Sequence, residues 1–285
     1  MSHRPYAAST SWIALVALVA FMAPHCGSDG GESGSDDGVV VDIPSDPGAT
    51  PLTPEILAGM VSQSNYELDL DFVADVRPPG SDHWKAVQDL CAQRFADLGY
   101  TVELQEYGEN GVGVNVIGVL EGSTKKDEKV IVSAHYDHIA GCEGADDNGS
   151  GVAGLLESAR VLAKAQYART LVVACWDQEE IGLVGAMAYA MRAKASEDRI
   201  TVAFVYEMIG YSDTAPGSQG VPMGFDLLFP ESTKWLADRG NTANFRNPYY
   251  HCAAGPDSVD TLGPVFATKV VSATVGAAAE MLEIL

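Results

Sequence analysis

Five segments of the chain carry the hydrophobic patterns of β-strands. Residues 100–107 alternate between polar and apolar side chains, as in a strand with two different faces. The four other segments are short and apolar over most of their length, which is typical of buried strands. They cover residues 115–121, 129–136, 169–177 and 200–208, and the polar residues 123–128 are expected to form the turn before the second of them.

Helical spacing of apolar residues fills the intervals between these strands. In residues 83–100 the apolar positions recur every three or four residues, and Asp82 is expected to cap this helix. The segment RPPGS at 77–81 is expected to be a turn, because prolines and glycine disfavour helix and central strand. The other predicted helices cover residues 53–60, 68–76, 151–165, 178–194 (beginning as a loop) and 266–285.

Strands that alternate with helices predict an α/β fold. We expect a mixed, largely parallel central sheet flanked by helices on its faces. With 285 residues, of which 47% are hydrophobic, the chain is long and apolar enough for one sizeable globular domain.

The strongly acidic composition narrows the choice of partners. A formal net charge of −22 excludes a general nucleic-acid binder, because phosphate binding requires a basic face. An acidic surface also disfavours contact with anionic membranes.

The first 26 residues have the pattern of an export signal. An apolar stretch at 12–23 is too short to span a membrane and follows a weakly positive start. The small residues before Cys26 resemble a bacterial lipoprotein signal, although His25 stands where that pattern prefers Gly or Ala. This implies lipid attachment at Cys26, and an ordinary secretory signal is the alternative. We therefore expect an exported protein, either lipid-anchored in the cell envelope or secreted.

Residues 27–50 separate this signal from the folded domain. They are rich in Gly, Ser, Asp and Pro and contain few large apolar residues, which predicts a flexible acidic tether. The folded domain is expected to cover residues 51–285.

Four cysteines lie within the expected domain, at positions 91, 142, 175 and 252. In an oxidising compartment an even set can form disulfides, but the spacing does not give the pairing. Cys142 and Cys252 each stand beside a candidate metal ligand, so we expect these two to lie close in space. Buried free thiols are the alternative for all four.

The densest group of reactive side chains follows the apolar run at 129–136. His135, Asp137 and His138 come first, and a glycine-rich loop with Asp146 and Asp147 follows. Asn148 then starts the next helical segment, and an Asn or a Ser is expected near the cap of that helix. Imidazole and carboxylate groups in one loop suit a divalent metal of the zinc type. A solvated surface loop is the alternative.

Three further polar clusters occur downstream. Glu179 and Glu180 follow the strand at 169–177, Glu207 ends the strand at 200–208, and His251 lies in NPYYH. A carboxylate that ends so apolar a strand needs a cation or hydrogen bonds. Because α/β proteins place their sites at the carboxyl ends of strands, these clusters together predict one metal centre.

These motifs resemble those of peptidase family M28, the zinc aminopeptidases related to glutamate carboxypeptidase. The resemblance runs from about Pro51 to the C-terminus. It rests on HYDH, GADDNGSG, the EE of WDQEEIG, YEMIGY and NPYYH. It implies a zinc exopeptidase-like fold of the phosphorylase/hydrolase type.

The resemblance also implies a role for each site residue. Asp147 resembles the carboxylate that bridges two zinc ions, and Glu179 the general base. Glu207 stands where the family often has Asp, although relatives with the EMIGY form have Glu. Asp137 resembles the carboxylate that orients a ligand histidine. The implied zinc ligands are His135, Asp147, Glu180, Glu207 and His251.

The chemistry explains this division of roles. Two metals roughly 3.5–4 Å apart can share a water and lower its pKa toward neutrality. The base must not be a ligand, because it moves a proton from that water to the leaving amine. Glu179 and Glu180 can divide these tasks, since adjacent side chains on an extended segment point to different sides. The implied substrate is a peptide with a free N-terminus.

One segment of the family pattern is missing. Relatives usually carry SDHxxFW and an apolar strand between YEMIGY and NPxYH, and the residues between Tyr211 and His251 contain no such motif. Two alternatives therefore stand beside a zinc aminopeptidase. One is an inactive descendant that binds metal or peptide, and the other is a one-zinc cyclase acting on N-terminal glutamine.

Overall fold

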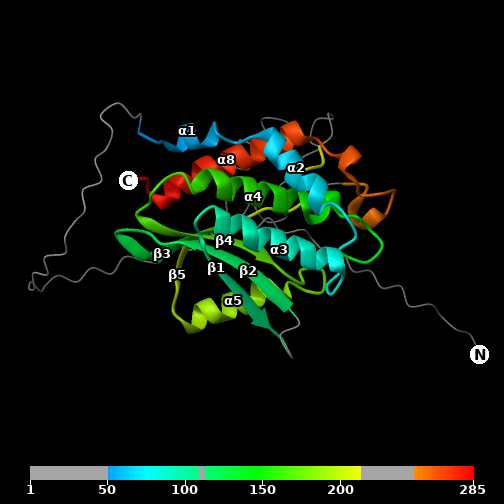
Figure 1. The fold of residues 1–285 in the computed structure, drawn as a ribbon, viewed down its shortest axis with the longest axis horizontal. Helices are drawn as coiled ribbons and strands as arrows, with labels where there is room; N and C mark the ends of the chain where they lie inside the picture. Colours follow the sequence, from blue (N-terminus) through cyan, green and yellow to red (C-terminus); the bar gives the residue numbers. More distant parts are fainter. Residues whose placement is uncertain (1–50, 109–112, 213–246) are drawn as a thin grey trace, which may run out of the picture.

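A five-stranded sheet runs through the middle of the domain (Figure 1). The computed structural model describes residues 51–108, 113–212 and 247–285. The expected signal, the Cys26 anchor and the tether at 27–50 lie outside these residues. The strands are β1 (Thr101–Tyr107), β2 (Gly113–Leu120), β3 (Lys125–His135), β4 (Arg169–Trp176) and β5 (Arg199–Val205).

The sheet is mixed, with the order β1-β2-β4-β3-β5. β1 pairs antiparallel with β2, and β2 pairs antiparallel with β4. β3 pairs in parallel with both β4 and β5, so these three strands end at the same edge of the sheet. The α/β prediction with a mixed sheet is confirmed.

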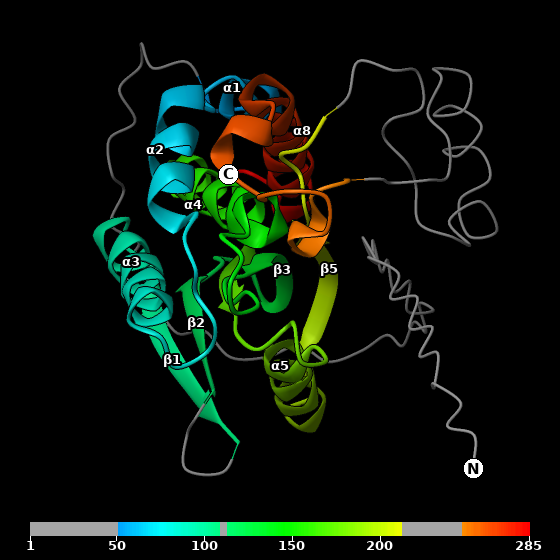
Figure 2. The ribbon, with the colours of Figure 1, turned by 90° about the vertical axis from the view of Figure 1, so that its right-hand side faces the viewer.

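Helices cover both faces of the sheet. In Figures 1 and 2, α5 lies on one side, and α3, α4 and α8 lie on the other with α1 and α2 beyond them. The helices are α1 (Pro54–Ala58), α2 (Gln63–Val73), α3 (Asp82–Asp97), α4 (Gly151–Leu162), α5 (Val184–Ala195) and α8 (Pro264–Leu282). A π-helical turn at Ala145–Ser150 and short 3₁₀ turns at Tyr250–Cys252 and Val259–Thr261 complete the described elements.

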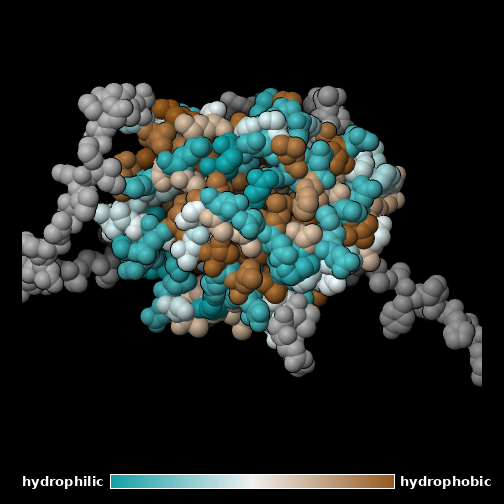
Figure 3. All heavy atoms as spheres, in the orientation of Figure 1, coloured by the Kyte–Doolittle hydropathy of each residue, from teal (hydrophilic) through white to brown (hydrophobic). Residues whose placement is uncertain are grey.

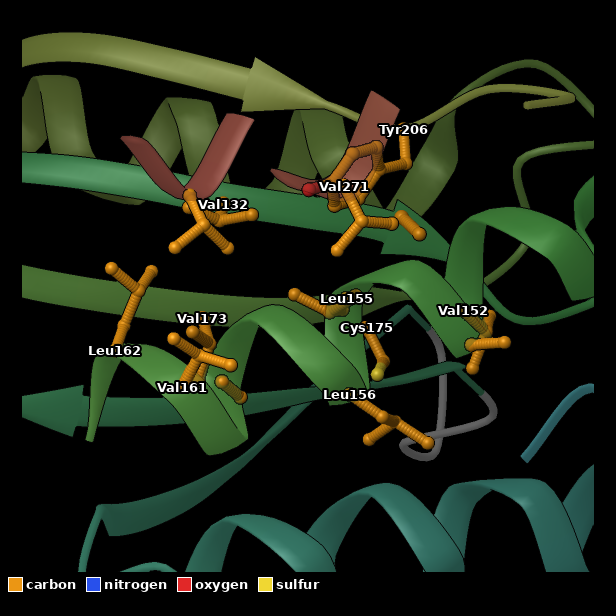
Figure 4. Close-up of a cluster of buried hydrophobic side chains, with 14 of the residues drawn as sticks. Val132, Val152, Leu155, Leu156, Val161, Leu162, Val173, Cys175, Tyr206 and Val271 are labelled. Atoms are coloured by element: carbon orange, nitrogen blue, oxygen red, sulfur yellow. The ribbon is translucent and has the colours of Figure 1, made fainter. Parts of the chain in front are cut away.

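Successive side chains of a strand point to opposite faces of the sheet and therefore enter two different cores. In β4, Val173 and Cys175 pack in the larger core against α3, α4 and α8, whereas Val172 and Ala174 face the smaller core under α5. Figure 4 shows Leu155 of α4 among the side chains of the larger core. Burying one such leucine contributes roughly 1.5–3 kcal/mol. Because both faces of β4 are buried, its sequence is apolar without alternation, as expected.

The helix α8 is long and apolar enough to span a membrane by length and composition alone. Its buried residues, which include Val271 and Val275, belong to the larger core and pack beside α4 and α1. It therefore serves as a core helix of this domain. On the face of the molecule seen in Figure 3, hydrophobic residues are interspersed with hydrophilic ones.

Three boundaries differ from those expected. Ser81, not Asp82, is the N-cap of α3, because its hydroxyl accepts the amide of Trp84. The polar residues at 125–128 belong to β3 rather than to a turn, because this end of the strand is only partly buried and tolerates charge. The helix expected at 68–76 instead spans Gln63–Val73, since Ser62 caps it earlier.

Candidate metal centre

The polar residues that follow the parallel strands β3, β4 and β5 lie at one edge of the sheet. β3 ends at His135, β4 ends just before the segment 177–180, and β5 ends two residues before Glu207. The π-helical turn that follows β3 carries Asp147, and the 3₁₀ turn at Tyr250–Cys252 brings in His251. All five expected metal ligands are therefore brought together in the structure.

The first group of ligand atoms surrounds the buried ring of His135. Its Nε2 lies 3.3 Å from Oδ1 of Asp147 and 3.4 Å from Oε2 of Glu207. Among the residues that the structure describes, this buried Nε2 has no hydrogen-bond partner. A buried nitrogen without a partner, facing two carboxylates, is suited to a cation between them.

The second group surrounds His251. Its Nε2 lies 3.3 Å from Oδ2 of Asp147 and 3.0 Å from Oε2 of Glu180. The two oxygens of Asp147 thus face different histidines, which is the arrangement of a bridging carboxylate. Burial would raise the pKa of the Asp147 carboxyl, but the adjacent imidazoles of His135 and His251 lower it below its usual value.

The spacing of these atoms fits tetrahedral zinc. Zinc bonds nitrogen and carboxylate oxygen at about 2.0–2.1 Å, so two ligand atoms in a tetrahedron lie about 3.3 Å apart. The observed separations from His135 are 3.3 and 3.4 Å, and those from His251 are 3.0 and 3.3 Å. Both groups also consist of the imidazole and carboxylate donors that zinc accepts. The residues present therefore fit zinc.

The adjacent glutamates occupy different environments. Glu180, with a side chain only 7% exposed, contacts His251, whereas Glu179 is 32% exposed and its Oε2 lies 3.9 Å from Nε2 of His135. Burial raises the pKa of the Glu179 carboxyl to about 7. The two side chains point to different partners, and the more accessible one is poised to exchange a proton near neutral pH.

Asp137 makes a different contact with His135 from the one expected. Nδ1 of His135 hydrogen-bonds the main-chain oxygen of Asp137 at 3.1 Å, whereas the carboxylate is 3.6 Å away. The carboxylate instead accepts the main-chain amides of Glu179 at 2.9 Å and Glu180 at 3.3 Å. Asp137 thus orients His135 through its main chain and the glutamate pair through its side chain.

His138 is a site residue to which the sequence assigned no role. Its ring is fully buried, and Nδ1 lies 2.7 Å from Oε1 of Glu180, the oxygen that does not face His251. A Cβ at Gly144 would come within 2.4 Å of this ring, and Gly144 has a φ of +60°, so glycine is required there. In the sequence, the signal that could have identified His138 as a site residue is its position as the last residue of the HYDH motif.

Asp257 holds the turn that carries Asp147. Its buried carboxylate accepts the main-chain amide of Asp146 at 3.0 Å and that of Asp147 at 3.1 Å. The carboxylate of Asp146 in turn accepts the amide of Gly210 at 2.8 Å and the side-chain amide of Asn247 at 2.6 Å. These bonds join the segments that carry Glu207 and His251 to the central turn.

Two further links fasten the same turn. Cys142 and Cys252 form a disulfide, a pairing that the sequence left open. Nδ2 of Asn148 donates to Oε2 of Glu207 at 3.3 Å, and its Oδ1 accepts the amide of Gly151 at the start of α4. Ser150 is the N-cap of α4, while Asn148 bonds the first residue of the helix and also orients Glu207.

The buried side chain of Arg77 holds the loop that carries Asp147 in place through hydrogen bonds. Burial lowers the pKa of its guanidinium to about 10, so it stays charged near neutral pH, close to the site carboxylates. It donates hydrogen bonds to the main-chain oxygens of Val73, Asp75, Tyr136, Glu143, Gly144 and Asp147.

Left-handed backbone occurs beside the site residues. Gln178 has a φ of +57°, Met208 of +48° and His251 of +52°, and none of them is glycine. Such conformations are uncommon for these residue types and persist where surrounding contacts determine them. The ligand segments are thus held in place at some cost in backbone energy.

Comparison with known proteins relates this geometry to one family. The model for Peptidase family M28 matches residues 115–253, which include all five expected ligands. Aminopeptidase YwaD of Bacillus subtilis is 33% identical over 114 residues, covering 39% of this chain and 25% of that protein. The chain spans about a third of the length of the curated relatives it matches.

Two solved structures show the same fold. BSAP, a zinc aminopeptidase from Bacillus subtilis, matches with a TM-score of 0.60 and 15% identity over 82% of this chain and 96% of that one. A glutaminyl cyclase from Bacteroides thetaiotaomicron matches with a TM-score of 0.59 and 16% identity over 76% and 97%. Proteins of both activities therefore share this fold, and residues 115–253 of the chain, which hold all five candidate ligands, match the model of peptidase family M28.

Proposed function

We propose that this domain is a zinc-dependent exopeptidase, an aminopeptidase that removes N-terminal residues from peptides. The observation that carries the proposal is that one carboxylate, Asp147, faces two histidines with its two oxygens. Glu179 lies beside the two histidines, and its Oε2 is 3.9 Å from Nε2 of His135, which is beyond hydrogen-bond distance. A two-metal hydrolase needs this combination of a bridging ligand and a free base.

Two zinc ions would be held by the two groups of residues. His135 and Glu207 would bind one, His251 and Glu180 would bind the other, and Asp147 would join them. When bound, zinc polarises a substrate carbonyl and lowers the pKa of water toward neutrality.

The chain's own residues would then move the proton. Glu179, whose pKa burial raises to about 7, would accept a proton from the attacking water and return it to the leaving amine. Asp137 fixes the main chain of the glutamate pair, and His138 fixes the oxygen of Glu180 that faces away from His251. These contacts keep Glu180 and Glu179 in separate roles.

We expect two zinc ions per chain after reconstitution and hydrolysis of amino-acid amides that have a free N-terminus. Elemental analysis of the purified protein and a panel of such amides, with N-acetylated amides as the control, provide the measurement. His251→Ala should lower the metal content toward one ion per chain, because the second group loses its imidazole.

The same experiment separates the alternatives. One zinc with cyclisation of N-terminal glutamine would identify a cyclase. Metal binding without turnover of any amide would identify an inactive descendant. No more than one ion in the reconstituted wild type would refute the two-zinc site.

Exchange of each glutamate for glutamine tests the division of roles. Glu179→Gln keeps the size of the side chain but cannot accept a proton, so kcat should fall on the order of 10²–10⁴-fold with full metal content. Glu180→Gln removes a charged ligand, so metal content itself should fall. If Glu179→Gln loses metal while Glu180→Gln keeps its metal and loses activity, the assignment within the pair is reversed.

Asp257 is expected to act as a positioning residue for Asp147. Asp257→Asn replaces one accepting oxygen with an amide group that opposes a main-chain N–H. Zinc affinity should therefore fall about 10–100-fold, measured by competition with a chelating dye. Asp260→Asn, on the exposed surface of the same segment, is the matched control and should leave affinity unchanged. Wild-type zinc affinity in Asp257→Asn would contradict this role.

We further propose that the protein is exported and held in the cell envelope through lipid at Cys26. The sequence before Cys26 supports this, as does a disulfide in the domain. Cys26→Ser should move the protein from the membrane to the soluble fraction, followed by immunoblotting of fractionated cells. Equal membrane association of the variant would rule out the anchor.

A further inference from the structure

The two remaining cysteines of the domain lie against each other in the larger core. Cys91 belongs to α3 and Cys175 to β4, and both are fully buried and stand as free thiols in the structure. Their Sγ atoms are 2.6 Å apart. Non-bonded heavy atoms settle at roughly 3.5–4.0 Å, whereas bonded sulfurs lie about 2.05 Å apart. The two sulfurs are thus closer than a non-bonded contact.

Contacts on both elements hold this pair in register. Trp84, two helical turns before Cys91, donates from Nε1 to Oδ1 of Asp177 at 2.8 Å, and Asp177 follows Cys175 by two residues. Gln88 of α3 donates to the hydroxyl of Tyr136, which stacks on Trp84. α3 is therefore fixed against the end of β4 by side chains other than the cysteines. The approach of the two sulfurs follows from the packing of the two elements.

The rest of the chain indicates an oxidising compartment. Cys142 and Cys252 form a disulfide, and disulfides persist mainly in proteins outside the cytoplasm. The thiols of Cys91 and Cys175 would meet the same oxidant while the chain folds.

We propose that Cys91 and Cys175 form a second disulfide, which joins α3 covalently to β4. The thiolate of one cysteine attacks the disulfide of a thiol oxidase and forms a mixed disulfide. The thiolate of the other cysteine then displaces the oxidase. Two electrons and, through the solvent, the two thiol protons of the chain pass to the oxidase, which leaves as a dithiol.

This exchange takes place before α3 packs on the sheet. Both sulfurs are buried in the folded domain, so an oxidase cannot reach them there. Burial also raises the pKa of the Cys175 thiol well above its usual value, so little thiolate is available after folding. The same burial protects the finished bond from reductants.

The crosslink would strengthen the support of the metal centre. β4 leads directly to Glu179 and Glu180, and the sequence separation of 84 residues between the cysteines encloses His135 and Asp147. A bond that closes a loop of this length stabilises a domain mainly by restricting the unfolded chain. This inference is independent of the proposed aminopeptidase activity.

Thiol mapping of the full chain tests the proposal. The Cys26→Ser protein, exported in bacteria, is denatured without reductant, treated with a maleimide and digested for mass spectrometry. We expect no label on any cysteine, and a linked peptide containing Cys91 and Cys175 that is two hydrogens lighter than the sum of its parts. Maleimide on both Cys91 and Cys175 would overturn the proposal, as would a link from either one to another cysteine.

A pair of variants isolates the effect of this bond on stability. In Cys142→Ser/Cys252→Ser the proposed bond is the last one in the domain, so reduction in denaturant before refolding should lower Tm by roughly 5–15 °C. Adding Cys91→Ala and Cys175→Ala to this background should abolish the difference between reduced and unreduced samples. Equal Tm values for both samples of the first variant would count against the bond. If that variant does not fold, the peptide map of the Cys26→Ser protein decides.

Discussion

The crowding of negative charge at one edge of the sheet is the constraint on which the rest of the site depends. Four carboxylates, those of Asp147, Glu179, Glu180 and Glu207, converge on the imidazoles of His135 and His251 beside this edge. Such a group is costly to bury without cations or hydrogen-bond donors. Zinc would supply the cations, while main-chain amides and Arg77 supply fixed positive potential from the protein side.

Many hydrogen bonds join side chains to the main chain around the site. Arg77 directs its guanidinium to carbonyl oxygens rather than to a carboxylate, so its charge remains available to the cluster as a whole. Asp137 and Asp257 each accept two consecutive main-chain amides, which fixes the segments that carry Glu180 and Asp147. Side chains outside the candidate ligand set therefore determine where the candidate ligand atoms lie.

The sequence predicted most of the fold, because the hydrophobic period reports burial directly. β4 was found from its apolar run, and the positions of His135 and Glu207 at strand ends followed from the same pattern. Asp257 had no such signal, since a carboxylate in a Gly- and Pro-containing loop looks like solvated surface. Only the approach of that loop to Asp147, distant in sequence, shows that it is buried. The roles of Arg77 and His138 were hidden for the same reason.

His251 shows why long-range links matter most where no strand supports a ligand. It lies in a 3₁₀ turn with a φ of +52°, outside the sheet. A disulfide to Cys142 holds the next residue, Cys252, and Asn247 and Asp257 bond to the central turn on either side of it. These links begin and end within the described segments 142–147 and 247–257. The position of His251 therefore depends on its own neighbours, and a shorter connection before Asn247 is compatible with a complete set of ligands.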